Sequence, residues 1–304
     1  MKRTDEYTLA ITAFAFVGII WGSNFIFMKL SSNYITPLQI VFVRVLFGFI
    51  PILGFAIYKK ALSRHHLKYA MHFFSMGMLA TVIYYFGFAK GTSLLNSGIA
   101  GAISGAIPLF SLGAAMIFLR EEKITCWKIF GAAIGFLGVL GIARPFDSDG
   151  SSNSMLGITY MVIGSLSVGL SFIYAKRFIS PLKLSPLTLT TYQLGSGLIV
   201  LFLITDFSGI NKITENSTAL LSMILGLGLA GTGVAYLCYY FIIDKLGALA
   251  ASSVTYIPPV IALIIATTIA GEEIELQDFI FTGLILCAVS IVTWSNKKTI
   301  PTKN

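Results

Sequence analysis

Long apolar runs recur along the chain, and short polar segments separate them. A helix needs about 20 mainly apolar residues to cross the hydrocarbon core of a bilayer. Segments of this kind lie at 8–30, 37–58, 69–90, 93–119, 124–144, 155–176, 187–205, 219–243, 248–270 and 277–295. The pattern predicts an all-α polytopic membrane protein with ten transmembrane helices.

The composition supports the same class. Of 304 residues, 56% are hydrophobic and 11% are charged, and the mean hydropathy is +0.85, which excludes an ordinary soluble domain. The net charge of +8 would suit a nucleic-acid-binding protein, but the basic residues form short clusters between apolar segments. We therefore expect contact with a lipid bilayer and with no nucleic acid.

The basic residues also predict the orientation, because lysine and arginine accumulate in cytoplasmic loops. With the N-terminus inside, sixteen of them fall on the cytoplasmic side, and only Lys90, Arg144 and Lys212 fall outside. Lys29 and Arg44 lie within or beside spans. The asymmetry predicts cytoplasmic N and C termini for a multi-pass protein of the inner, or plasma, membrane.

The two halves of the chain resemble each other. The segment from Gly22 to Lys29 matches the segment from Gly169 to Lys176, and further matches follow in order: Tyr84-Tyr85-Phe86 with Tyr239-Tyr240-Phe241, Pro108 with Pro259, and Glu121-Glu122 with Glu272-Glu273. Five spans per half is an odd number, so the second half must cross the membrane upside down relative to the first. We expect two inverted five-helix repeats, 7–144 and 155–296, with a solute site between them near the midplane.

Several motifs resemble the drug/metabolite transporter superfamily, in particular its ten-helix EamA-type carriers. They are Trp21-Gly-Ser-Asn-Phe25 with Lys29, Arg44 after Pro37, Pro108 followed by Arg120-Glu-Glu122, and the echoes Pro259 and Gly271-Glu-Glu273. The resemblance covers residues 7–296. It implies a secondary carrier of small metabolites, often an exporter of amino acids or toxic compounds, with a central cavity lined by both halves. The second half departs from the first at Val168, where Trp21 stands, and at Gln193, where Arg44 stands.

Aromatic and small polar side chains at helical spacing, together with the two intramembrane cations, are candidates for the solute path. The candidates are Trp21, Asn24, Lys29, Arg44, Thr81, Tyr84, Gln193, Tyr236, Tyr239, Ser252 and Tyr256. In helix three, Thr81, Tyr84 and Phe88 are expected to share one face. Pro108 and Pro259 are expected to kink their helices and free carbonyls towards a cavity.

The two cations each allow two interpretations. Lys29 either extends to the extracytoplasmic interface from a helix end or acts at the outer mouth of the path. Arg44 lies about 10 Å deep at 1.5 Å per residue, which is far for such an extension. It either binds backbone carbonyls of a neighbouring broken helix or contacts an anionic group of the substrate.

The pattern favours a transporter of a small-molecule substrate over an enzyme. No carboxylate lies mid-span, the three histidines are unpaired within spans, and no phosphate-binding loop is present. We therefore expect no catalytic residue, no metal and no cofactor. The leading hypothesis is an exporter of amino acids or related amphipathic compounds by alternating access. An importer or exchanger of a charged metabolite is the alternative, and a non-transporting scaffold ranks third. A glycine ridge, Gly131-x3-Gly135-x2-Gly138-x2-Gly141, indicates close helix packing, either internal or in a homodimer.

Overall fold

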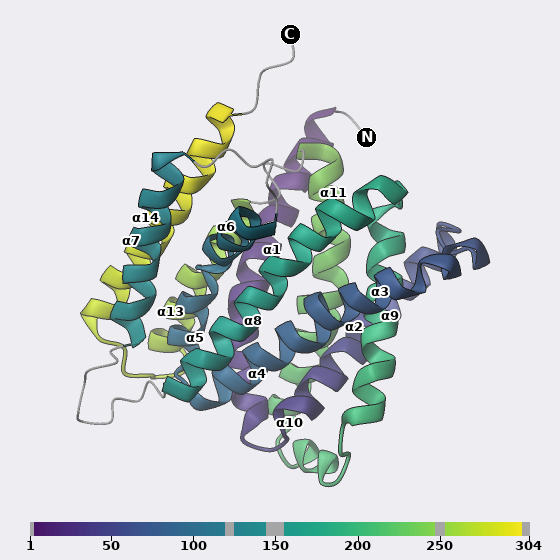
Figure 1. Cartoon of the computed structure of the whole chain (residues 1–304). Helices are drawn as coiled ribbons and strands as arrows, with labels where there is room; N and C mark the ends of the chain where they lie inside the picture. The colour runs from purple at the N-terminus through teal and green to yellow at the C-terminus, as the bar shows by residue number, and fades with distance from the viewer. Residues whose placement is uncertain (1–2, 119–124, 144–154, 247–252, 300–304) are drawn as a thin grey trace.

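A computed structural model describes residues 3–118, 125–143, 155–246 and 253–299, and all regular structure in these ranges is helical. Figure 1 shows the helices as a bundle in which the start of α1 and the end of α14 lie at the same end. We call this the terminal end and the opposite one the far end.

The first half of the chain alternates long helices with short, locally wound segments. Its elements are α1 (Arg3–Ser32), α2 (Pro37–Tyr58), the 3₁₀ segment η1 (Arg64–Tyr69), α3 (Ala70–Gly77), the π-helical segment η2 (Met78–Ile83), α4 (Tyr84–Leu94), α5 (Ser97–Ser104), α6 (Ile107–Phe118) and α7 (Cys126–Ala143). Since η1, α3, η2 and α4 follow without a gap, residues 64–94 form one helical rod.

The second half follows a similar plan. Its elements are α8 (Met155–Tyr174), the π-helical η3 (Ala175–Ile179), the 3₁₀ segment η4 (Ser180–Leu182), α9 (Pro186–Ile204), the 3₁₀ segment η5 (Ile210–Glu215), α10 (Ser217–Leu221), the π-helical η6 (Ser222–Val234), α11 (Ala235–Leu246), the 3₁₀ segment η7 (Val254–Tyr256), α13 (Ile257–Thr268) and α14 (Leu276–Thr299). Residues 217–246 again form one rod.

Seven of these helical rods are long and apolar enough to cross a membrane. They are Glu6–Ser32, Pro37–Tyr58, Arg64–Leu94, Ser97–Phe118, Met155–Leu182, Pro186–Ile204 and Ser217–Leu246. Three shorter apolar helices, Cys126–Ile142, Val254–Thr268 and Leu276–Val292, complete the bundle. Many large apolar side chains, such as Ile199, Phe202 and Leu203, point outward from it. The chain is therefore a polytopic membrane protein, because such a surface is stable against lipid and not against water.

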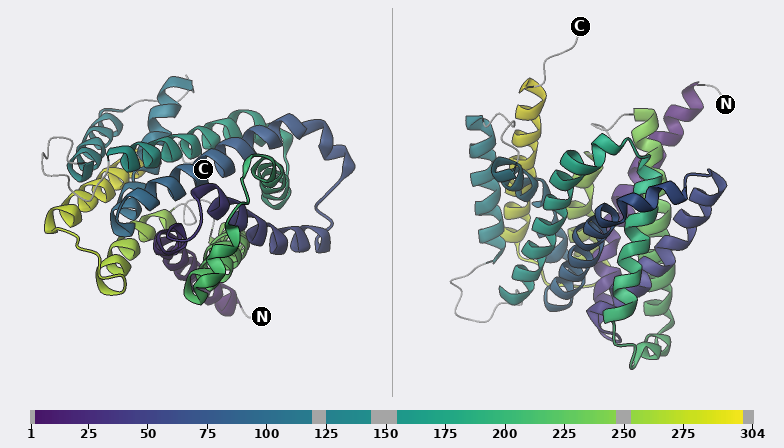
Figure 2. Two further views of the ribbon diagram at one scale, coloured as in Figure 1. Left: turned by 90° about the horizontal axis from the view of Figure 1, so that it is seen from below. Right: turned by 45° about the vertical axis from the view of Figure 1, so that its right-hand side comes forward.

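Figure 2 shows the same bundle from below and from its right-hand side, and its helices pack in pairs. Helix α2 packs against η6, and α9 packs against α3 and η2. Helix α1 packs against α11 and α13, and α8 packs against α4 and α6. Further large contacts join α5 to α13, α7 to α14, α2 to α9 and α1 to η6.

Helix α2 begins after a capping Thr36 and helix α9 after a capping Ser185, and near the start of each helix a side chain hydrogen-bonds the segment that follows the other helix. Gln39 completes a capping box with Thr36, and its Nε2 donates to the carbonyls of Asp206 and Ser208 just beyond α9. In the opposite direction, Thr188 Oγ1 donates to the carbonyl of Ala61 just beyond α2. In the same far-end loop the Ser208 N–H donates to the Asp206 carboxylate, which lowers the pKa of that carboxyl.

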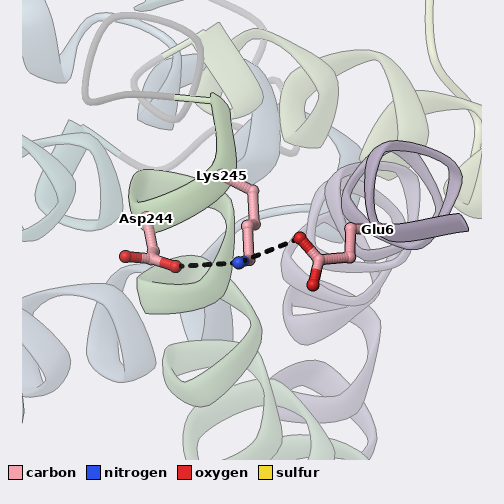
Figure 3. A network of polar contacts seen from close by, with 3 residues as sticks. All are labelled: Glu6, Asp244 and Lys245. Atoms are coloured by element: carbon pink, nitrogen blue, oxygen red, sulfur yellow. Dashed lines mark ion pairs between the residues drawn. The ribbon is translucent and has the colours of Figure 1, made fainter. Parts of the chain in front are cut away.

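At the terminal end, Lys245 joins the start of α1 to the end of α11. Its Nζ lies 3.2 Å from Glu6 Oε2 and 3.5 Å from Asp244 Oδ2 (Figure 3). All three side chains are partly exposed, so this ion pair fixes the position of the ends more than it stabilises the fold.

The two predicted kinks lie slightly before their prolines. Helix α5 ends at Ser104 and α6 begins at Ile107, so Pro108 occupies the first turn of a new helix, where its missing N–H costs nothing. Pro259 likewise lies in the first turn of α13, after η7. The two breaks meet, because a Cβ on Gly105 would lie 2.9 Å from Pro259 Cγ.

The glycine ridge of α7 packs inside the chain. Gly131, Gly138 and Gly141 face Val292, Ile285 and Phe281 of α14, and Gly135 lies between Leu109 of α6 and Ala288 of α14. The ridge is thus occupied by α14, and a homodimer has no support from it.

Candidate functional site

Six aromatic side chains from α1, α4 and α11 meet in the interior. This central cluster consists of Trp21, Tyr84, Tyr85, Tyr236, Tyr239 and Tyr240. The Trp21 ring lies 5.6 Å from the Tyr239 ring and 6.5 Å, edge-on, from the Tyr236 ring. The hydroxyls of Tyr85 and Tyr236 lie 3.4 Å apart and link α4 to α11. The cluster therefore combines elements from both halves of the chain.

Arg44 enters this cluster from α2 and is almost fully buried, with 5% of its surface exposed. Its guanidinium carbon lies 3.9 Å from the centre of the Tyr85 ring, a close cation–π contact. Its Nε donates to Thr232 Oγ1 at 3.0 Å. Among the described residues no carboxylate forms an ion pair with it, and no backbone carbonyl accepts a hydrogen bond from it.

Thr232 is held in place by the wide turn of η6. Its hydroxyl donates to the carbonyl of Leu227, five residues earlier, while it accepts from Arg44. A π-helical turn leaves such carbonyls without their usual i+4 partner, and segments of this kind occur often at functional sites. The π-helical turn of η6 therefore sets the position of Thr232 and, through it, that of the Arg44 guanidinium.

A matching pair joins the two halves in the opposite sense. Gln193 of α9 donates through Nε2 to Thr81 Oγ1 of η2 at 3.2 Å. A Cβ on Gly48 would lie 2.6 Å from Thr232 side-chain carbons, and a Cβ on Gly197 would lie 3.0 Å from Thr81 Cγ2. Both helix pairs thus approach closely through a glycine placed one turn after the polar residue. Gln193 matches Arg44 in hydrogen bonding but brings no charge.

Asn24 of α1 is buried near the same turn of η6. Its Oδ1 is enclosed and, among the described residues, accepts no hydrogen bond. It rests against Gly231, the neighbour of Thr232, because a Cβ on that glycine would collide with it. An enclosed acceptor without a donor is costly, so it is a candidate to accept a donor from a solute.

Lys29 lies away from the cluster, at the far end. Its Nζ donates to the carbonyls of Leu95, at 2.7 Å, and Ser93, at 3.4 Å, which end α4. A cation there compensates the negative end of the helix dipole. The Glu272 carboxylate accepts from the N–H groups of Ser97 and Gly98, which begin α5. Lys29 and Glu272 therefore fix the connection between α4 and α5 from two sides.

The remaining predicted residues are dispersed. Ser252 lies outside the described residues, and Tyr256 is half-buried at the end of η7. Thr81 faces Gln193 of α9, whereas the Phe88 ring lies against Gly164 of α8 and the Tyr84 ring packs against Tyr85 and Phe88. The expected shared face is thus divided, because the π-helical turn of η2 changes the angular register between residues 81 and 84.

Tyr85, Tyr240 and Thr232 belong to the site but were not predicted as path residues. The repeated Tyr-Tyr-Phe triplets were the available signal for the two tyrosines. For Thr232 it was the glycine-rich run Gly226-Leu-Gly228-Leu-Ala-Gly231-Thr232-Gly233, which permits close helix approach.

An apolar groove of about 200 Å³ opens elsewhere, between the α5–α6 connection and α7. Its lining residues are Ala106, Leu109, Phe110, Ala132, Gly135, Phe136 and Val139. It offers no polar group to orient a solute, so we assign the candidate site to the central cluster with Arg44 and Asn24.

The sequence model of the EamA-like transporter family matches residues 8–144 and 155–294, which together make up most of the chain. The chain belongs to the EamA-like transporter family. An "Uncharacterized transporter" of Archaeoglobus fulgidus is 28% identical over 96% of this chain and 99% of its own length. The "Uncharacterized inner membrane transporter YedA" of Escherichia coli K12 is 27% identical over 90% of this chain and 87% of its own length.

A solved crystal structure shares the fold of this EamA-family chain. It aligns with a TM-score of 0.59 at 14% identity and covers 97% of this chain and 99% of the other. Membership of the family and the polytopic helical fold together make this protein a multi-pass membrane transporter. The family is one of transporters, which are not enzymes.

Proposed function

We propose that this EamA-family protein is a secondary transporter that moves small amphipathic metabolites, such as amino acids, out of the cell by alternating access. The observation that carries the proposal is the central cluster. It presents aromatic faces from α1, α4 and α11 together with a buried arginine from α2 and an unpartnered amide oxygen from α1. Aromatic walls supply affinity for an apolar body, and a few polar groups orient it.

The proposed architecture is ten spans in two inverted repeats, 7–144 and 155–296, in the inner membrane with both termini cytoplasmic. Reciprocal contacts support it. Gln39, Arg44 and Gly48 of α2 have the same spacing as Thr188, Gln193 and Gly197 of α9. The first of each set binds the loop that follows the other helix, and the other two contact a threonine in a π-helical segment.

This reciprocity suits a rocking motion. Two similar units that cross antiparallel can exchange their contacts and open a midplane site to either side in turn. At the far end, contacts between helix ends include Lys29 with the carbonyl of Leu95 within the first half and Asn96 with the carbonyl of Glu273 between the halves. Release of such contacts would open the far end, which the distribution of basic residues assigns to the outside.

An importer or exchanger of a charged metabolite is the second candidate function. The observation that favours it is the buried charge of Arg44, which has no carboxylate partner among the described residues. A gradient of a charged solute can drive its own exchange in either direction, so direction of transport separates the two candidates.

Topology is tested by single cysteines in a background from which Cys126, Cys238 and Cys287 are replaced. Ser63 and Asn211 are both exposed; Ser63 lies beside the start of α9, and Asn211 lies in η5, beyond the other end of α9. We expect an impermeant thiol reagent to label Asn211→Cys but not Ser63→Cys in intact cells. Labelling of both from one side would overturn the inverted arrangement.

Transport is tested by counterflow into proteoliposomes that contain the purified protein and a panel of amino acids, organic acids and neutral amphipathic metabolites. We expect exchange of at least one compound without an imposed proton or sodium gradient. Exchange that requires an imposed ion gradient would contradict a carrier driven by its solute alone, and no exchange of any compound would contradict transport of this panel altogether.

A further inference from the structure

The charge of Arg44 is buried, and the described residues supply no counter-charge for it. With 5% of its surface exposed, the guanidinium has left water, and a charge removed from water without a partner is strongly destabilising. Proteins usually compensate such a charge with a carboxylate or with several backbone carbonyls. Neither compensation is present for Arg44 within the described ranges.

The surrounding contacts orient the guanidinium without neutralising it. Thr232 accepts from Nε, and the face of the group lies on the Tyr85 ring. Thr232 is itself fixed by Leu227, and Tyr85 contacts the Tyr236 hydroxyl. Arginine carries five N–H donors, so the outer edge, with the two terminal nitrogens, retains donors for which no described residue supplies an acceptor.

Such an edge matches a planar acid group. Two parallel N–H donors of an arginine bind the two oxygens of a carboxylate in a bidentate pair. Among the described residues, Arg44 is the cation that contacts the central cluster, and Lys29 is engaged with the carbonyls that end α4. A single positive charge compensates a monoanion and leaves a dianionic phosphate group with an uncompensated charge.

We propose that the outer edge of Arg44 binds the carboxylate of the transported solute, whose apolar body packs against the central cluster. Asn24 Oδ1, against Gly231 and next to Thr232, supplies an acceptor for a donor elsewhere on the same solute. The inference rests on the proposed transport function and narrows its substrates to amphipathic monocarboxylates. Gln193, which matches Arg44 in the second half, hydrogen-bonds Thr81 and carries no charge. The carboxylate is therefore bound by the first half of the chain only, through Arg44.

The test uses the full-length protein in detergent and four acids, each paired with its primary amide: phenylalanine, leucine, 3-phenylpropionate and hexanoate. Phenylphosphonate, measured at a pH above its second pKa, is added as the dianionic probe. Affinity is measured by calorimetry for wild type, Arg44→Gln and Arg44→Lys. Lys90→Met is the control, because it removes a positive charge from α4 without touching Arg44. Thr232→Val is a second probe that keeps the charge and removes the Nε acceptor.

We expect at least one acid to bind wild type about 10- to 100-fold more tightly than its amide, which is the effect of one charge-assisted bidentate pair. Arg44→Gln should remove this preference and leave the amide unchanged. Arg44→Lys should retain part of it, and Lys90→Met all of it. Thr232→Val should weaken the acid more than the amide, so the inference stays testable even if Arg44→Gln fails to fold.

Three results would overturn the inference. They are equal binding of every acid and its amide by wild type, an acid preference that survives in Arg44→Gln, and a preference for phenylphosphonate over all four acids. Failure of the inference alone is recognised when wild type exchanges neutral metabolites in the counterflow panel. If neither acids nor neutral compounds bind or exchange, the proposed function fails together with it.

Discussion

Gly48→Ala should separate the helices that position Arg44. A Cβ at this position would lie 2.6 Å from Cβ and Cγ2 of Thr232 and 3.1 Å from the carbonyl oxygen of Gly228. Ordinary van der Waals contact begins at 3.4 Å, so α2 and η6 must move apart by roughly 0.8 Å. Overpacking of this kind costs about 1–3 kcal/mol. The movement also stretches the 3.0 Å hydrogen bond from Arg44 Nε to Thr232.

Gly54→Ala is the matched control, because it lies in the same helix and a Cβ there meets nothing within 4 Å. Both substitutions gain the same helix propensity, about 1 kcal/mol, and this gain cancels in the comparison. The difference between the two variants is therefore the overpacking term, about 1–3 kcal/mol in the free energy of unfolding. Thermal unfolding in detergent should show Gly48→Ala several degrees below Gly54→Ala.

The reasoning fails if Gly48→Ala and Gly54→Ala unfold at the same temperature, since α2 and η6 would then not be in close contact. A second check uses the other half of the chain. A Cβ on Gly197 would lie 3.0 Å from Thr81 Cγ2, a smaller overlap than at Gly48. The Gly197→Ala variant should therefore be destabilised less than Gly48→Ala. The reverse order would show that the distances at the two threonines do not control stability.

Two further predictions concern the ends of the bundle. Lys29→Met removes the donor to the carbonyls of Leu95 and Ser93. Because the ammonium is half-buried, the variant should be less stable than Lys90→Met by about 1 kcal/mol in thermal unfolding. Equal midpoints of unfolding for the two variants would refute the capping role. Glu6→Gln breaks the exposed ion pair with Lys245 and should leave the midpoint of unfolding nearly unchanged, with any small decrease disappearing in 1 M salt. A large decrease in the midpoint that does not depend on salt would show instead that the pair strongly stabilises the α1–α11 contact.

Several features followed from the sequence because they depend on local pattern. The apolar runs predicted a polytopic helical protein, and the membrane class and the EamA family are confirmed. Helix starts at Pro37 and Pro186 follow from proline after a capping Thr or Ser. The number of spans stays a prediction, because in three of the ten helices the described apolar stretch is shorter than the length that marks a span on its own.

The tertiary structure decided what the polar residues do. Lys29 and Arg44 are both cations near apolar helices, and the sequence allowed each either a structural or a solute role. Lys29 binds carbonyls that end α4, a contact between positions far apart in the chain. Arg44 meets Thr232 and Tyr85 because π-helical turns and glycines bring α2, η6 and α4 together. Period and composition predict which face of a helix is apolar, but a π-helical turn shifts that face by part of a turn. The partner of a buried charge is therefore set by the packing of distant segments, which local sequence does not encode.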